Sequence, residues 1–88
     1  MFNNLIFITM KKELIKLMES KIAAIAKMNV EVAVLGKKDK QIVISIVIDG
    51  NQAETTLAAN RISKLAGEKF NDGGYDAELE SYFCGINL

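Results

Sequence analysis

The segment QIVISIVIDG, residues 41–50, constrains the fold of this 88-residue chain more than any other part of the sequence. All its apolar residues are isoleucine or valine, the β-branched types that favour strands. Two sets of residues alternate along it and would face opposite sides of a sheet: Ile42, Ile44, Ile46 and Ile48 in one set, and Val43, Ser45 and Val47 in the other. The segment predicts a strand with apolar side chains on both faces.

A helix is predicted before this strand, from Thr9 to Asn29. Its apolar residues recur at helical spacing and would form one buried face: Leu14, Met18, Ile22 and Ile25, with Ile15 and Ala26 beside them. Thr9 can cap the start of the helix, and Asn29 tolerates the left-handed conformation that often ends one.

A β-hairpin and a second helix follow. Residues 30–35, VEVAVL, alternate with period two, and the polar turn 36–40, GKKDK, joins them to the strand of residues 41–50. Asn51 and Glu54 then match a capping-box variant that opens a helix running to Ala66, and Gly67 is a suitable stop. We expect the buried face of this helix to contain Leu57, Ala58, Ile62 and Leu65.

Two further strands are predicted near the ends of the chain. The apolar run LIFI at residues 5–8 is typical of a short buried strand. After a loop at residues 71–74, NDGG, the residues from Tyr75 to Cys84 alternate between apolar and acidic types over much of their length. Asp76, Glu78 and Glu80 would then share one face of a strand.

The predicted fold class is α+β, in one domain that comprises residues 1–88. The element order β-α-β-β-α-β is the split β-α-β arrangement of ferredoxin-like folds, with both helices on one face of an antiparallel sheet. An alternative order, α-β-β-α-β, applies if residues 1–9 are not a strand. Either Met1 or Met10 could be the native start.

An open sheet face follows from either order, and we expect it to be apolar. It would carry Val43, Val47, Ala33 and Leu35, with Tyr82 and Cys84 at its border. A large exposed apolar patch usually marks an interface. We therefore predict a homodimer that packs sheet to sheet, with four residues as the self-association set: Leu35, Val43, Val47 and Tyr82. The alternative is a solvated face whose valines and isoleucines merely favour strand formation.

Charge is divided along the chain although basic and acidic residues are equal in number. From Thr9 to Lys40 there are eight lysines and four acidic residues, whereas from Gln41 onward there are three basic and seven acidic residues. The alternatives are solvated faces or two partner surfaces: a basic turn with Lys37, Lys38 and Lys40, and an acidic strand with Asp76, Glu78 and Glu80. A second functional hypothesis is nucleic-acid binding through this turn and the first helix, including Lys11 and Lys12.

Enzymatic chemistry has few candidate residues here. The chain has no histidine and a single cysteine, which removes the commonest general base, the Ser-His-Asp and Cys-His arrangements, and Cys-His zinc sites. Asp76, Glu78 and Glu80 could gather a hard cation, but a solvated edge strand explains them better. Cys84 has apolar or neutral neighbours, which favours a passive packing role. We expect no enzyme activity, cofactor or metal.

The sequence also bears on location and role. The opening MFNNLIFITM lacks a basic segment and a small-residue cleavage site, and its apolar run is much shorter than the roughly 20 residues of a membrane span. One cysteine cannot form an intramolecular disulfide. These features favour a cytoplasmic interaction module, with an adaptor, inhibitor or regulatory role toward another protein and no contact with a membrane.

Overall fold

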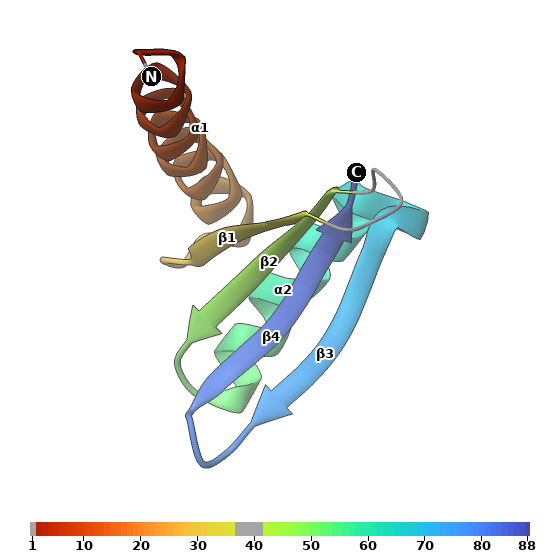
Figure 1. The fold of residues 1–88 in the computed structure, drawn as a ribbon. Coiled ribbons are helices and arrows are strands. Elements are labelled where there is room, and N and C mark those ends of the chain that lie inside the picture. The colour runs from red at the N-terminus through yellow and green to blue at the C-terminus, as the bar shows by residue number, and fades with distance from the viewer. Residues whose placement is uncertain (1, 37–41) are drawn as a thin grey trace.

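The computed structural model describes the backbone of residues 2–36 and 42–88 and the side chains of residues 12–35 and 42–88. Within these ranges, two helices accompany a four-stranded antiparallel sheet (Figure 1). The elements follow one another as α1 Phe2–Ala26, β1 Glu31–Gly36, β2 Ile42–Asp49, α2 Gln52–Ala66, β3 Phe70–Asp76 and β4 Ser81–Asn87. A single 3₁₀ turn, Gly67–Lys69, joins α2 to β3.

The strands lie in the order β1-β2-β4-β3, so the predicted β-α-β-β-α-β arrangement is not confirmed. The strand predicted at residues 5–8 is wrong, because these residues belong to α1. A short apolar run cannot be assigned to a strand by periodicity alone. No glycine or proline separates residues 5–8 from the amphipathic segment that follows, so the helix continues through them. The alternative α-β-β-α-β order has the right beginning and lacks one strand.

That additional strand comes from the C-terminal hairpin. The predicted loop at residues 71–74 lies in β3, and the predicted strand over residues 75–84 is interrupted by a turn at residues 77–80. The carboxylate of Asp76 accepts hydrogen bonds from the backbone N–H of Glu78, at 2.9 Å, and of Leu79, at 3.1 Å. This Asx-type turn reverses the chain, and Glu80 completes it with a φ of 50°.

A β-bulge explains how a glycine pair fits inside β3. The register between β3 and β4 shifts between Asp72 and Gly74. A Cβ atom on Gly73 would lie 2.7 Å from the carbonyl oxygen of Phe83, and Gly74 has a φ of +84°. Both positions therefore require glycine, which is why the sequence resembles a loop although the residues pair as a strand.

The bounds of α1 differ from those predicted. The helix begins at Phe2 rather than near Thr9, and it ends at Ala26 rather than near Asn29. Lys27, with a φ of 60°, takes the left-handed conformation that was expected of Asn29. Nη1 of Arg61 in α2 donates a 2.9 Å hydrogen bond to the carbonyl oxygen of Ala26, which satisfies one free acceptor at the helix end.

The prediction for α2 is confirmed at both ends. The side chain of Asn51 accepts a 2.8 Å hydrogen bond from the backbone N–H of Glu54, and Gly67 follows the helix with a φ of 58°. The buried face is only partly as predicted, since Ala58 and Ile62 are buried but Leu57 and Leu65 are exposed. Thr55 and Ala59 complete that face.

The hydrophobic core lies between the two helices and one face of the sheet. Ile44, Ile46 and Ile48 of β2 are buried in it as predicted, whereas Ile42 at the strand end is 44% exposed. The predicted stripe of α1 also contributes, but Leu14 is exposed. The remaining α1 residues of that stripe are buried or pack against the core: Ile15, Met18, Ile22, Ile25 and Ala26.

Helix α1 is longer than the surface that it covers. Figure 1 shows its N-terminal part, in red, extending away from the sheet, while its C-terminal part lies beside β1. The molecule consequently measures 46 × 25 × 25 Å along its principal axes. No helix in the described ranges combines the length and apolar content needed to cross a lipid bilayer.

Candidate functional site

The sheet face opposite the core is the first candidate site, and we call it the open face. Neighbouring residues in register share a face of a sheet, so strand pairing identifies its members. On β1 and β2 they are Glu31, Ala33, Leu35, Val43, Ser45, Val47 and Asp49. On β4 and β3 they are Ser81, Phe83, Gly85, Asn87, Asn71, Gly74 and Asp76.

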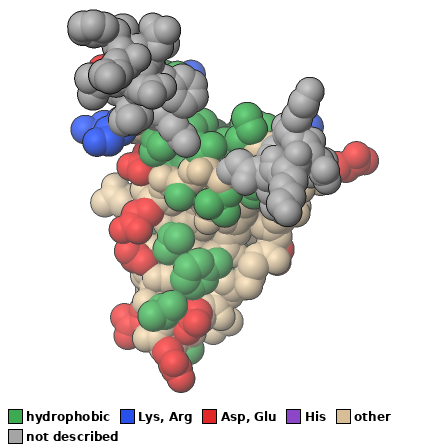
Figure 2. All heavy atoms as spheres, viewed as in Figure 1, with side chains coloured by type: hydrophobic (Ala, Val, Ile, Leu, Met, Phe, Trp, Pro, Cys, Tyr) green, Lys and Arg blue, Asp and Glu red, His purple; other side chains and the backbone are tan. Residues whose placement is uncertain are grey.

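Apolar side chains on the open face form two cross-strand pairs. Leu35 on β1 pairs with Val43 on β2, and Val47 on β2 pairs with Phe83 on β4. Leu35 is 51% exposed, the other three side chains are half-buried, and neither of the two described helices lies above them. Figure 2 shows hydrophobic side chains gathered along this face. The structure therefore places Leu35, Val43 and Val47 where the sequence predicted them.

Tyr82 lies on the other face, so the predicted position of this residue is wrong. It pairs with Ile48 of β2 and is buried on the helix-covered side. Cys84 pairs with Ile46 and is likewise buried there. The turn at residues 77–80 sets the alternation of β4, which puts Phe83 on the open face in place of its two neighbours.

Both misplaced residues hold their protons firmly. The phenol of Tyr82 donates a 2.5 Å hydrogen bond to the carboxylate of Asp72, and this bond, together with burial and the nearby negative charge, raises the pKa of Tyr82 to about 12. Burial and the charge of Asp72 raise the pKa of the Cys84 thiol to about 11. A thiol that stays protonated and buried at neutral pH is a poor nucleophile.

The predicted acidic row is not one face of a strand. Asp76 ends β3 and organises the turn, and Glu78 and Glu80 are exposed within that turn. The three residues still lie at one end of the sheet, because the hairpin joins β3 to β4 there. On the open face itself, the charged side chains of the described residues are Glu31, Asp49 and Asp76, all acidic. Asp49 accepts a 2.5 Å hydrogen bond from Oγ of Ser81.

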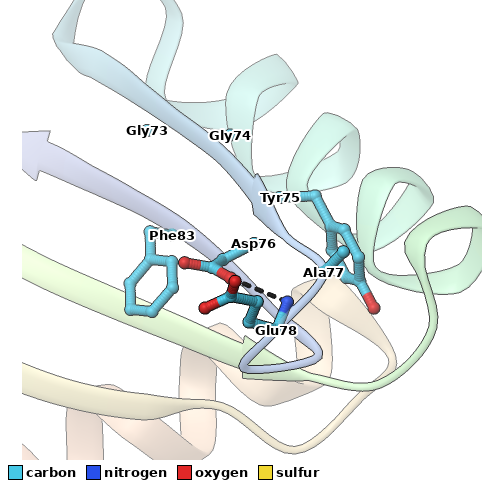
Figure 3. Close-up of a pocket in the computed structure, with 7 residues that line it drawn as sticks. All are labelled: Gly73, Gly74, Tyr75, Asp76, Ala77, Glu78 and Phe83. Atoms are coloured by element: carbon cyan, nitrogen blue, oxygen red, sulfur yellow. Dashed lines mark hydrogen bonds between the residues drawn. The ribbon is translucent and has the colours of Figure 1, made fainter.

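A shallow depression of about 520 Å³ lies beside this hairpin (Figure 3). Phe83, Asp76 and Glu78 line it, whereas Tyr75 points to the other side of β3 and donates a 2.9 Å hydrogen bond to the carbonyl oxygen of Gly50. The titratable side chains on the open-face side of this depression are carboxylates, which suit contact with a cationic side chain. Among the described residues, no group of three or more side chains is arranged to hold a metal ion.

Most of the lysines predicted as a basic partner surface lie outside the described residues. Lys37, Lys38 and Lys40 lie outside the described residues, and so does the side chain of Lys11. Lys12 is exposed on α1.

Phe83 is the interface candidate that sequence reasoning missed. Its signal was the Asp76–Glu80 turn, since placing a hairpin there rather than a continuous strand would have assigned Phe83 to the face of Val47. Comparisons with protein-family models, curated proteins and solved structures give no match for this chain. Function must therefore be argued from the surface itself.

Proposed function

We propose that this protein is a small, non-enzymatic protein–protein interaction module that homodimerises through its open face. The observation that carries the proposal is the two apolar cross-strand pairs, Leu35–Val43 and Val47–Phe83, on a sheet face that no helix of the described ranges covers. Burial of exposed apolar area of this kind against a partner stabilises the complex by about 25 cal/mol for each Å² removed from water. A regulatory, adaptor or inhibitor role in the cytoplasm fits such a module.

The size of the open face sets the expected strength of the dimer. Four strands about 4.8 Å apart, with some seven residues rising about 3.3 Å each, give a footprint of roughly 440 Å². Two such faces would bury on the order of 900 Å², below the roughly 1,200 Å² of standard stable interfaces. Self-association through this face alone is therefore expected to be reversible and concentration-dependent.

A further protein partner would meet the acidic hairpin end. Asp76, Glu78 and Glu80 gather there, and Glu31 and Asp49 lie at the same end of the strands. This surface favours a partner with basic side chains. The alternative of nucleic-acid binding was predicted for the lysine-rich turn, which lies outside the described residues, and for α1, where Lys12 is exposed. The acidic open face would repel phosphates and does not add to such a surface.

The test is the solution mass measured by light scattering over a concentration series. Wild type should show a dimer that dissociates on dilution, and Val43→Lys should be a folded monomer because it places an ammonium group within the apolar surface. Leu65→Lys is the matched control, since Leu65 is 68% exposed on α2, away from the open face. It should remain dimeric. A wild type that is monomeric at every concentration, or an unchanged Val43→Lys dimer, would contradict the proposal.

A further inference from the structure

The open face has a trough that crosses the strands. Its floor is a row of small or polar residues in register, Ala33, Ser45, Gly85 and Asn71. The pair Leu35–Val43 forms a ridge on one side, and the pair Val47–Phe83 forms a ridge on the other. A depression of about 220 Å³ lies at this place and is lined in part by Leu35, Val43, Ser45, Phe83 and Gly85.

The trough is wide enough for one row of large side chains. The Cα atoms of its two ridges are four residues apart along the strands, which corresponds to about 13 Å. A helix with its side chains is about 10–12 Å in diameter, so one row of helix side chains could enter the trough between the ridge side chains. Two sheets packed face to face could instead place the ridges of one copy in the trough of the other. The choice between these occupants depends on which other apolar surface the protomer leaves exposed.

Helix α1 carries an apolar stripe that is not used by its own core. Leu14 is 56% exposed and Leu17 is 51% exposed, one helical turn apart, although Ile15 and Met18 beside them pack against the core. This stripe faces away from the core of its own protomer and has no described partner within it.

We propose that, in the dimer, α1 of each copy lies in the trough of the other copy, with the stripe of Leu14 and Leu17 against the floor. This inference rests on the proposed function and specifies which surfaces meet. The stripe cannot reach its own trough, because α1 is a continuous helix whose C-terminal part packs on the opposite sheet face. Each copy thus supplies one helix and one trough, as a two-fold dimer requires.

The charges of the two surfaces are complementary. Lys12, Lys16 and Lys21 are exposed on α1 near the stripe and outnumber the one exposed carboxylate beside it, Glu13. The charged residues of the described open face are Glu31, Asp49 and Asp76. Glu19 of α1 accepts a 3.2 Å hydrogen bond from the backbone N–H of Val32 in its own copy. This carboxylate is therefore engaged within its own protomer, and the lysines are available to meet the acidic face.

The first experiment compares three variants by light scattering, with circular dichroism to establish that each is folded. Leu14→Lys/Leu17→Lys should raise the dimer dissociation constant at least tenfold, and Leu57→Lys/Leu65→Lys, with both changes on exposed α2 positions, should leave it unchanged. Ser45→Phe fills the trough and should also favour the monomer. If the sheets packed face to face without α1, Leu14→Lys/Leu17→Lys would leave the dimer unchanged, and that result would overturn the inference.

A mixing experiment separates this inference from the proposed function. The Leu14→Lys/Leu17→Lys variant retains an intact trough, and Val43→Lys retains an intact α1. Mixed together, two variants that are monomeric alone should form a heterodimer through one remaining helix–trough contact. Failure to form it would overturn the inference. A Val43→Lys monomer alongside an unchanged Leu14→Lys/Leu17→Lys dimer would also overturn it and leave the proposed function standing, whereas a monomeric wild type would remove both.

Discussion

Tyr82 shows how one residue on the wrong side of a strand changes the functional interpretation. A continuous strand over residues 75–84 would put Tyr82 on the same face as Glu78 and Glu80, at the border of the open face, but Tyr82 is buried under the helices and hydrogen-bonded to Asp72. Phe83, the next residue, takes the exposed position. Side chains alternate with period two, and the continuous strand predicted over residues 75–84 missed the turn at residues 77–80, so these two residues were assigned to the wrong faces.

The raised pKa values of Tyr82 and Cys84 predict how the stability of the fold changes at alkaline pH. Tyr82 and Cys84 are protonated more firmly in the folded state, with pKa values of about 12 and about 11 against ordinary values of 10.0 and 9.0. Their contribution to stability is complete below pH 9 and is lost as the pH rises to 12. The free energy of unfolding in urea should therefore fall steadily between these pH values.

Asp72→Asn is the sharpest variant for this test. The hydrogen bond to the carboxylate and its charge both hold the proton on Tyr82, so their removal should lower the pKa of this phenol. Ultraviolet titration of phenolate formation measures the change, and Tyr75→Phe simplifies the signal to one tyrosine. An unshifted titration in Asp72→Asn would contradict the assigned cause.

At the scale of elements, local signals predicted α2 and the β1–β2 pair well. Asn51, Glu54 and Gly67 specify the ends of α2 through backbone hydrogen bonds that need no distant partner. The alternation of β2 assigned Ile44, Ile46 and Ile48 to the core. β3 could not be found in this way, because a bulge at Gly73 makes a strand out of residues that are typical of a loop.

The strand prediction for residues 5–8 was wrong for a related reason. Four apolar residues suit a buried strand and a helix equally, and only the uninterrupted helical segment that follows decides between them. The exposure of Leu14 and Leu17 also could not be predicted from local sequence. Which apolar residues of α1 face the core depends on where the helix rests on the sheet, and this is a property of the tertiary structure.

The cap of α2 gives a prediction about the element itself. Asn51→Ala removes the acceptor for the N–H of Glu54 and should lower the free energy of unfolding by about 1 kcal/mol. Asn60→Ala is the matched control, because Asn60 is exposed within the helix, where alanine is the better helix former. Urea denaturation should show a lower midpoint for the first variant only. Equal midpoints would show that the cap contributes nothing.

At the scale of the whole molecule, α1 makes the protomer elongated. The Cα radius of gyration is 13.9 Å, whereas a compact domain of this length has roughly 12 Å. Small-angle X-ray scattering on monomeric Val43→Lys should give the larger value and a longest dimension consistent with the 46 Å axis. A radius of gyration near the compact-domain value would contradict this prediction, because it would mean that α1 is folded against the sheet and α2.

The order of the strands has a consequence for synthesis on the ribosome. β4, which lies between β2 and β3, is the last of the four strands in the chain. β2 pairs with β1 along one edge and with β4 along the other. β4 therefore cannot pair with β2 along its full length until the residues up to Asn87 have left the exit tunnel. During that interval the nascent chain exposes an isoleucine-rich strand edge, the kind of surface that chaperones shield. The sheet closes only after translation of this region is complete.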